Sequence, residues 1–102
     1  MTNYAIISEA IAKKVNEAET ALESIELVIY EITQPTVNDL EKRYIKGEDV
    51  GEALDEAYEA HEKACNEHEK REYIYKELKE AQEHYKEVMK HIEHANYAKC
   101  NW

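Results

Sequence analysis

The sequence contains no phenylalanine, one proline and only two glycines among its 102 residues. Glycine and proline are the residues that most often end helices and form turns, so their scarcity leaves few places where a helix must stop. The abundant alanine, glutamate, lysine, leucine and isoleucine favour helices. We therefore predict an all-α protein with a single domain, residues 1–102, because this length leaves no room for a second domain.

The chain also lacks a long apolar run and a basic leader. No segment approaches the roughly 20 apolar residues of a membrane-spanning helix, and the N-terminus does not have the pattern of a secretion signal. With 13 basic against 23 acidic residues, the formal net charge is −10, which disfavours direct binding to nucleic acid or to an anionic membrane. We expect a cytoplasmic protein that binds basic protein surfaces.

Cysteines and catalytic motifs are equally sparse. The only two cysteines, Cys65 and Cys100, fall in one predicted helix, where about 35 residues hold them some 50 Å apart and exclude a disulfide between them. The sequence has no glycine-rich phosphate-binding loop, no nucleophile elbow and no isolated carboxylate pair suited to acid–base catalysis. We therefore expect neither enzymatic activity nor a cofactor.

Apolar residues recur every three or four positions in the first third of the chain. They predict a helix over residues 3–33 whose core-facing stripe is Ile7, Ile11, Val15, Ala18, Leu22, Ile25, Ile29 and Ile32. Pro35 is expected to end this helix, because its ring disfavours a helical conformation in the residue before it. Thr36 is then expected to cap a short second helix, 37–46, which Gly47 terminates and whose apolar side carries Leu40, Tyr44 and Ile45.

Neither glycine nor proline follows Gly51, so a third helix is predicted to run from about residue 50 to about residue 98, a rod of about 75 Å. Asp49 and Glu52 have the spacing of a capping box at its start. The apolar stripe rotates by roughly 110° over four heptads, which suits a coiled-coil-like helix packed antiparallel on the first one. The alternative is a break near Asn66, which would give a three-helix bundle.

A continuous rod would extend beyond the first helix and leave about 30 Å of apolar surface bare. A second copy is the commonest cover for such a surface, and tyrosine, of which there are eight, is enriched at interfaces. We therefore predict a homodimer whose interface contains Tyr73, Ile74, Tyr75, Leu78, Tyr85, Val88, Met89 and Ile92. The alternative is that these are partly exposed core residues of a slender monomer.

The third helix begins with a dense run of carboxylates. No lysine or arginine occurs in this stretch, which contains Glu48, Asp49, Glu52, Asp55, Glu56, Glu59 and Glu62. Like charges three or four residues apart destabilise a helix by about 0.2–0.5 kcal/mol per pair, so folding alone does not favour this pattern. We predict that these carboxylates bind a basic partner; the alternative is an ordinary solvated helix face.

Three functional hypotheses follow from these patterns. The leading one is an inhibitor or decoy on a basic, nucleic-acid-handling surface, because carboxylates that repeat every turn of about 5.4 Å resemble a row of phosphates. By size and charge, the chain is of the type that phages use against host nucleases. The second hypothesis is a structural or adaptor coiled-coil dimer.

The third hypothesis is a metal site at His61, Cys65 and His68, whose spacing places them on one helix face. Against it, the paired spacings typical of zinc sites are absent. The competing interpretation makes His61 and His68 polar positions within a coiled-coil seam.

Overall fold

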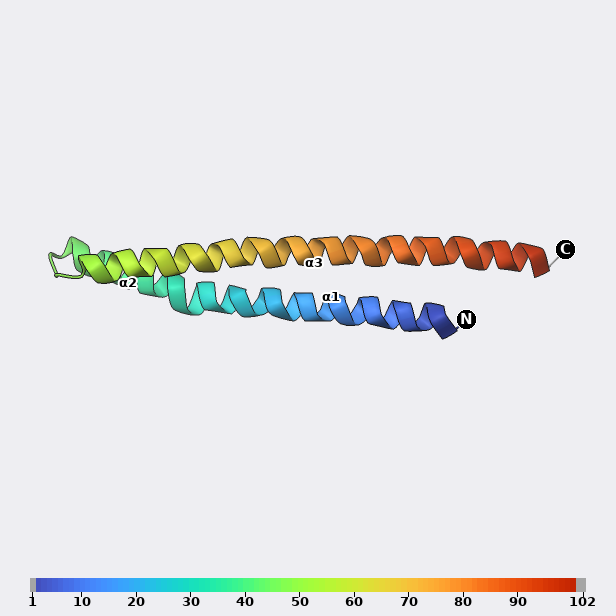
Figure 1. Cartoon of the computed structure of the whole chain (residues 1–102). Coiled ribbons are helices and arrows are strands. Elements are labelled where there is room, and N and C mark those ends of the chain that lie inside the picture. The colour runs from blue at the N-terminus through green and yellow to red at the C-terminus, as the bar shows by residue number, and fades with distance from the viewer. Residues whose placement is uncertain (1, 101–102) are drawn as a thin grey trace.

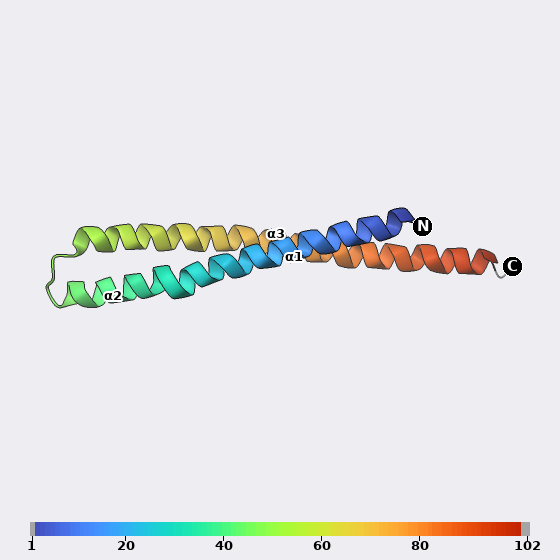
Figure 2. The same ribbon diagram turned by 90° about the horizontal axis from the view of Figure 1, so that it is seen from below.

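The computed structural model of the chain is a long helical hairpin (Figure 1), and it describes the backbone of residues 2–100 and the side chains of residues 5–94. Along the chain it contains α1 (Thr2–Val28), the π-helical segment η1 (Ile29–Thr33), α2 (Gln34–Ile45) and α3 (Gly51–Cys100). α3 runs antiparallel to the other three elements (Figure 2). The molecule measures 83 × 17 × 15 Å, so it is a rod two helices wide, and the predicted all-α hairpin is confirmed.

The predicted break at Pro35 is wrong, because α1, η1 and α2 form one continuous arm. The π-helical segment allows the chain to pass through the proline: the N–H of Gln34 bonds to the carbonyl of Ile29, five residues back. Pro35, which has no N–H to donate, thus falls where the hydrogen bonds change register, in the first turn of α2. Thr36 does not cap a new helix; its hydroxyl donates to the carbonyl of Ile32.

The wider π-helical turn shifts the buried positions that follow it by one residue along the chain. Ile25 and Ile29 are buried as predicted, but the next buried residues are Thr33 and Val37, and Ile32 is 59% exposed. The same change of register contradicts the apolar side predicted for the short second helix, because Tyr44 and Ile45 are exposed and only Leu40 is half-buried. The core therefore follows the predicted stripe only from Ile11 to Ile29. Ile7, the first residue of that stripe, was wrongly placed in the core: it is 44% exposed, because the seven-residue spacing of the buried α1 residues puts it beside the buried row.

α3 is unbroken through Asn66, so the three-helix alternative is wrong. Residues spaced alternately three and four apart on α3 are all buried or half-buried: Leu54, Ala57, His61, Ala64, His68, Arg71, Tyr75, Leu78, Gln82, Tyr85, Met89 and Ile92. We call this row the α3 seam. A strict seven-residue repeat of this kind is the pattern of a supercoiled helix pair, as the rotating stripe predicted.

The predicted bare stretch of α3 is largely covered. The 27, 5 and 12 residues of α1, η1 and α2 form an arm almost as long as the 50-residue α3. α3 extends past the start of α1 only in its last part (Figure 1). The expectation of about 30 Å of uncovered stripe is therefore wrong, because it depended on a helix that stopped before Pro35.

A tight connection joins the two arms. Gly47 has a φ of +88°, and its N–H donates to the carbonyl of Tyr44. The N–H of Glu48 donates to the carbonyl of Arg43. These two hydrogen bonds form the Schellman motif that ends many helices. At the start of α3 the N–H of Leu54 donates to the carbonyl of Val50. Val50 therefore holds the N-cap position that the predicted capping box gave to Asp49.

The two glycines of this connection give opposite predictions. Gly47→Ala is expected to lower the free energy of unfolding by about 1 kcal/mol, because its left-handed backbone is unfavourable for alanine although nothing lies within 4 Å of the new methyl group. Gly51→Ala is expected to raise the free energy of unfolding by about 0.5 kcal/mol. Gly51 is helical, and the new methyl group would make an ordinary 3.7 Å contact with Tyr44. Urea denaturation followed by circular dichroism measures both, and destabilisation by both variants would contradict this geometry.

Candidate functional site

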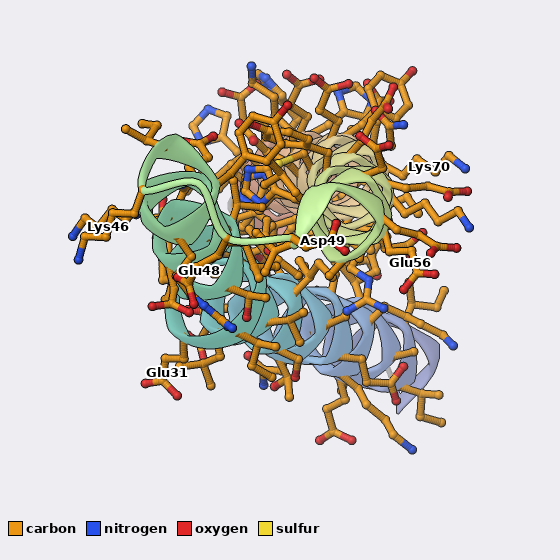
Figure 3. All side chains as sticks on the ribbon, turned by 90° about the vertical axis from the view of Figure 1, so that its left-hand side faces the viewer. Glu31, Lys46, Glu48, Asp49, Glu56 and Lys70 are labelled. Atoms are coloured by element: carbon orange, nitrogen blue, oxygen red, sulfur yellow. The ribbon has the colours of Figure 1, made fainter. Side chains whose placement is uncertain are left out.

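Five of the predicted partner-binding carboxylates lie together on α3, and none of them belongs to the α3 seam. They form what we call the acidic ridge, and all are exposed: Glu52, Asp55, Glu56, Glu59 and Glu62. Glu48 and Asp49 do not lie on the helix, because α3 begins at Gly51. Seen along the rod from the loop end, Glu48 lies near α2 and Glu56 projects from the opposite side of the view (Figure 3).

Most carboxylates of the ridge form no ion pair with a described side chain. Glu48, outside the ridge, pairs with Arg43 at 3.3 Å. Within the ridge only Glu59 forms an ion pair among the described side chains, with Lys63 at 3.3 Å. That pair is exposed, with 67% and 76% of the two side chains accessible, so it contributes little stability. The ridge therefore presents its negative charge to solvent over three turns of a rigid helix.

Tyr58 lies beside the ridge and ties it to the other arm. Its hydroxyl donates a hydrogen bond of 2.6 Å to Glu41 of α2. This bond raises the pKa of Tyr58 above its ordinary value, with smaller contributions from partial desolvation and from the charges of Glu41 and Asp55. The tyrosine therefore keeps its proton and its link to α2 when the surrounding carboxylates are charged.

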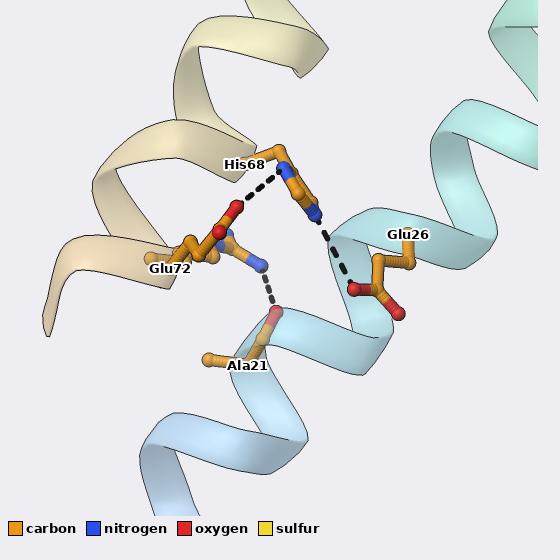
Figure 4. Close-up of polar contacts among 5 residues, drawn as sticks. Ala21, Glu26, His68 and Glu72 are labelled. Atoms are coloured by element: carbon orange, nitrogen blue, oxygen red, sulfur yellow. Dashed lines mark hydrogen bonds and ion pairs between the residues drawn. The ribbon is translucent and has the colours of Figure 1, made fainter. Parts of the chain in front are cut away.

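Contacts between the arms define two sides of the hairpin. On one, which we call the His68 side, Nε2 of His68 lies 3.3 Å from Glu26 of α1 and Nδ1 lies 3.6 Å from Glu72 of α3 (Figure 4). On the other, the Arg71 side, Arg71 donates to the carbonyl of Ala21 at 2.7 Å and to Glu67 at 3.0 Å. Exposed residues that flank the seam can be assigned to one side or the other from their position in the seven-residue repeat.

Charge differs sharply between the two sides. On α1 and α3, four lysines lie on the His68 side, Lys76, Lys79, Lys86 and Lys90, against many more carboxylates, Glu9, Glu19, Glu23, Glu26, Asp55, Glu62, Glu69, Glu72, Glu83 and Glu93. On the Arg71 side the charges balance: Lys14, Lys63, Lys70 and Arg71 against Glu17, Glu56, Glu67 and Glu77. The excess negative charge of the chain thus continues from the ridge along the His68 side.

The seam also contains a polar cluster at the π-helical segment. Thr33 Oγ1 lies 2.9 Å from Nδ1 of His61, whose Nε2 lies 3.6 Å from the sulfur of Cys65. His68 is engaged separately by Glu26 and Glu72. The predicted trio of His61, Cys65 and His68 is therefore not brought together, and among the described side chains no group of three or more His, Cys, Asp or Glu is arranged to hold a metal ion.

The residues predicted for a homodimer interface divide into two sets. Those in the α3 seam are half-buried: Tyr75, Leu78, Tyr85, Met89 and Ile92. The remaining three are exposed, with accessible fractions of 65% for Tyr73, 53% for Ile74 and 39% for Val88. Cys100 lies outside the described side chains. Of the residues predicted for the interface, only Tyr73, Ile74 and Val88 therefore present substantial apolar surface to solvent.

The interpretation of His61 and His68 as polar positions within the seam is confirmed, because both contact the other arm. Sequence reasoning missed that Arg71 also faces that arm. The available signal was the seven-residue repeat itself, counted from Leu54 through polar as well as apolar positions.

No helix within residues 2–100 combines the length and apolarity required to cross a bilayer. No protein-family model, curated protein or solved structure matches this chain.

Proposed function

We propose that the hairpin is a non-enzymatic protein-binding module whose acidic ridge occupies a basic surface of a nucleic-acid-handling protein, as an inhibitor or decoy. The observation that supports this proposal is the uncompensated charge of Glu52, Asp55, Glu56 and Glu62, which form no ion pair among the described side chains. Like charges at this spacing disfavour the helix, so their presence without counterions is consistent with selection for binding.

The shape and position of the ridge fit such a role. Its carboxylates repeat with the helical pitch of about 5.4 Å and point away from the other arm, so a groove that accepts a nucleic-acid backbone meets a comparable row of negative charges. The net charge of −10 steers the chain toward basic surfaces and away from nucleic acid. A second candidate function, a structural coiled-coil dimer, is favoured by the exposure of Ile74 and Val88.

The test starts with the immobilised full chain, exposed to cell lysate at low and at high salt, with the bound proteins identified by mass spectrometry. We expect basic nucleic-acid-binding proteins that elute as salt rises, because the screening length falls from about 30 Å at 0.01 M to about 8 Å at 0.15 M. Double-stranded DNA is expected to compete with the hairpin for the captured protein. Binding that survives high salt, or that DNA does not affect, would contradict the decoy.

Charge reversal localises the binding surface. The triple variant Glu52→Lys, Glu56→Lys and Glu59→Lys is expected to weaken binding of the captured protein at least about 100-fold, because three attractive contacts become repulsive. The matched control, Glu80→Lys, Glu83→Lys and Glu87→Lys, makes the same charge change at exposed positions farther along α3. Equal losses from the two triples, measured by calorimetry, would show that net charge and not the ridge determines binding.

A further inference from the structure

We infer that a second copy of this chain docks on the Arg71 side of the hairpin, so that two hairpins form a symmetric four-helix bundle. This inference does not depend on the proposed function of the acidic ridge. The single hairpin exposes more surface than a compact protein of its mass. The accessible area is 8172 Å², whereas a compact monomer of 12.0 kDa exposes about 6,000 Å².

The buried core is correspondingly thin. Among the described residues the buried apolar side chains are few and lie between the two arms: Val15, Ile25, Ile29, Val37, Leu54 and Ala64. No described side chain is completely buried. Two helices packed along one seam cannot enclose a core, whereas four helices can, because each then buries a wider stripe of its surface.

A second apolar row runs beside the seam on the Arg71 side. On α3 it consists of Ile74, Ala81 and Val88, each seven residues after the last. On α1 it consists of Ile7, Ala21 and Val28, and the remaining heptad position, between Ile7 and Ala21, is the exposed Lys14. Ile74, Ile7 and Val88 are 53%, 44% and 39% exposed. A seam flanked by one further apolar row is the pattern of helices that pack in a bundle, not of an isolated two-stranded coiled coil.

Both halves of this row lie on the same face of the molecule. The Arg71 guanidinium reaches across to the carbonyl of Ala21, a member of the row on α1 (Figure 4). It also bonds to Glu67, which occupies the matching position one heptad before Ile74. The two arms therefore contribute to a single surface. Its alanines allow close approach of another helix pair.

Charge identifies the second copy as the occupant. A chain with net charge −10 repels itself on the His68 side, where carboxylates dominate. On the Arg71 side the carboxylates and cations are equal in number, so another copy meets no net repulsion there. The balanced face offers no excess charge to attract a strongly basic or acidic protein, whereas a self-complementary face suits two-fold pairing.

The area is sufficient for a stable dimer. The apolar row spans about 22 residues of α1, a length of roughly 33 Å, and the hairpin is 17 Å wide. The flat projection is therefore roughly 560 Å² per copy, and the two copies together exceed the approximately 1,000 Å² expected of a specific interface. The row on α3 begins beyond the acidic ridge, so the dimer leaves most of the ridge accessible.

Sedimentation equilibrium of the full chain tests the inference. We expect a mass of twice 12.0 kDa at micromolar concentration, in low and in high salt. Ile74→Glu is expected to raise the dimer dissociation constant at least about 100-fold, because two-fold symmetry places the charge in the interface twice. Circular dichroism checks that the variant remains helical. Val88→Glu, at the far end of the row, is expected to raise the dimer dissociation constant as well and provides a second test.

The matched control is Tyr73→Glu, which adds the same charge at the neighbouring and more exposed position, 65% against 53%, but on the outer face of α3. It is expected to leave the dimer intact. A monomeric wild-type chain at every concentration would overturn the inference, as would equal weakening by Tyr73→Glu and Ile74→Glu. The ridge-reversal triple is expected to stay dimeric, so failure of the decoy and failure of the dimer are distinguishable.

Discussion

Ile29→Ala is expected to lower the free energy of unfolding by about 3 kcal/mol, whereas Ile32→Ala is expected to cost less than about 0.5 kcal/mol. The two isoleucines lie three residues apart in the same π-helical segment, but Ile29 is 9% exposed and Ile32 is 59% exposed. Ile29 packs with Ile25 and Ala64 in the densest part of the core, so its truncation leaves a cavity there. At Ile32 the lost methyl groups face solvent.

Urea denaturation of both variants at one fixed protein concentration measures this difference, since self-association would make stability depend on concentration. The pair tests the register of η1 directly. In an uninterrupted α-helical stripe both positions would be core positions, so losses of similar size would show that Ile32, and not Thr33, faces α3.

A second large effect is expected from the polar cluster that η1 brings into the seam. Thr33→Val alone leaves Nδ1 of His61 without its 2.9 Å partner, and His61→Leu alone leaves the threonine hydroxyl only its 3.4 Å bond to Ile29. Each single variant is therefore expected to be less stable than the wild type by about 1 kcal/mol. The double variant is expected to be at least as stable as the wild type, because two apolar groups then pack without a desolvated polar atom.

The resulting double-mutant cycle should give a coupling energy of about 2 kcal/mol between Thr33 and His61. Chemical denaturation of the four proteins supplies it. Thr36→Val is a suitable comparison, because its hydroxyl bonds only within its own arm and should show no coupling to His61. Additive losses for Thr33 and His61 would mean that the observed hydrogen bond does not contribute to holding the arms together.

The architecture was largely predictable, because it follows from the scarcity of glycine and proline in the sequence. With no glycine or proline after Gly51, nothing breaks α3, and its rotating stripe predicted the supercoil that the seam shows. The path through Pro35 was not predictable from the same rules. Proline usually ends a helix, and the exception depends on a turn in which Gln34 bonds back to Ile29, a choice that is made by packing against the other arm.

That single difference affected the rest of the interpretation. A first arm that stopped before Pro35 seemed too short for α3, so half-buried seam residues such as Tyr75 and Leu78 were assigned to a dimer interface. Exposure of the α3 carboxylates followed from helical spacing alone. The loop positions of Glu48 and Asp49 did not, because the extent of the turn depends on the backbone of Gly47. The identity of any partner requires experiment, because no residue pattern encodes it.

The short connection around Gly47 has a consequence for how the hairpin forms. Residues beside the turn meet after closing a loop of only a few positions, and each further contact between the arms extends an existing pair by one turn. Formation therefore resembles closing a zipper from Gly47 outward, with a small entropic cost at every step. Because Glu52 to Glu62 lie near the closed end, these carboxylates take up their arrangement early in this process.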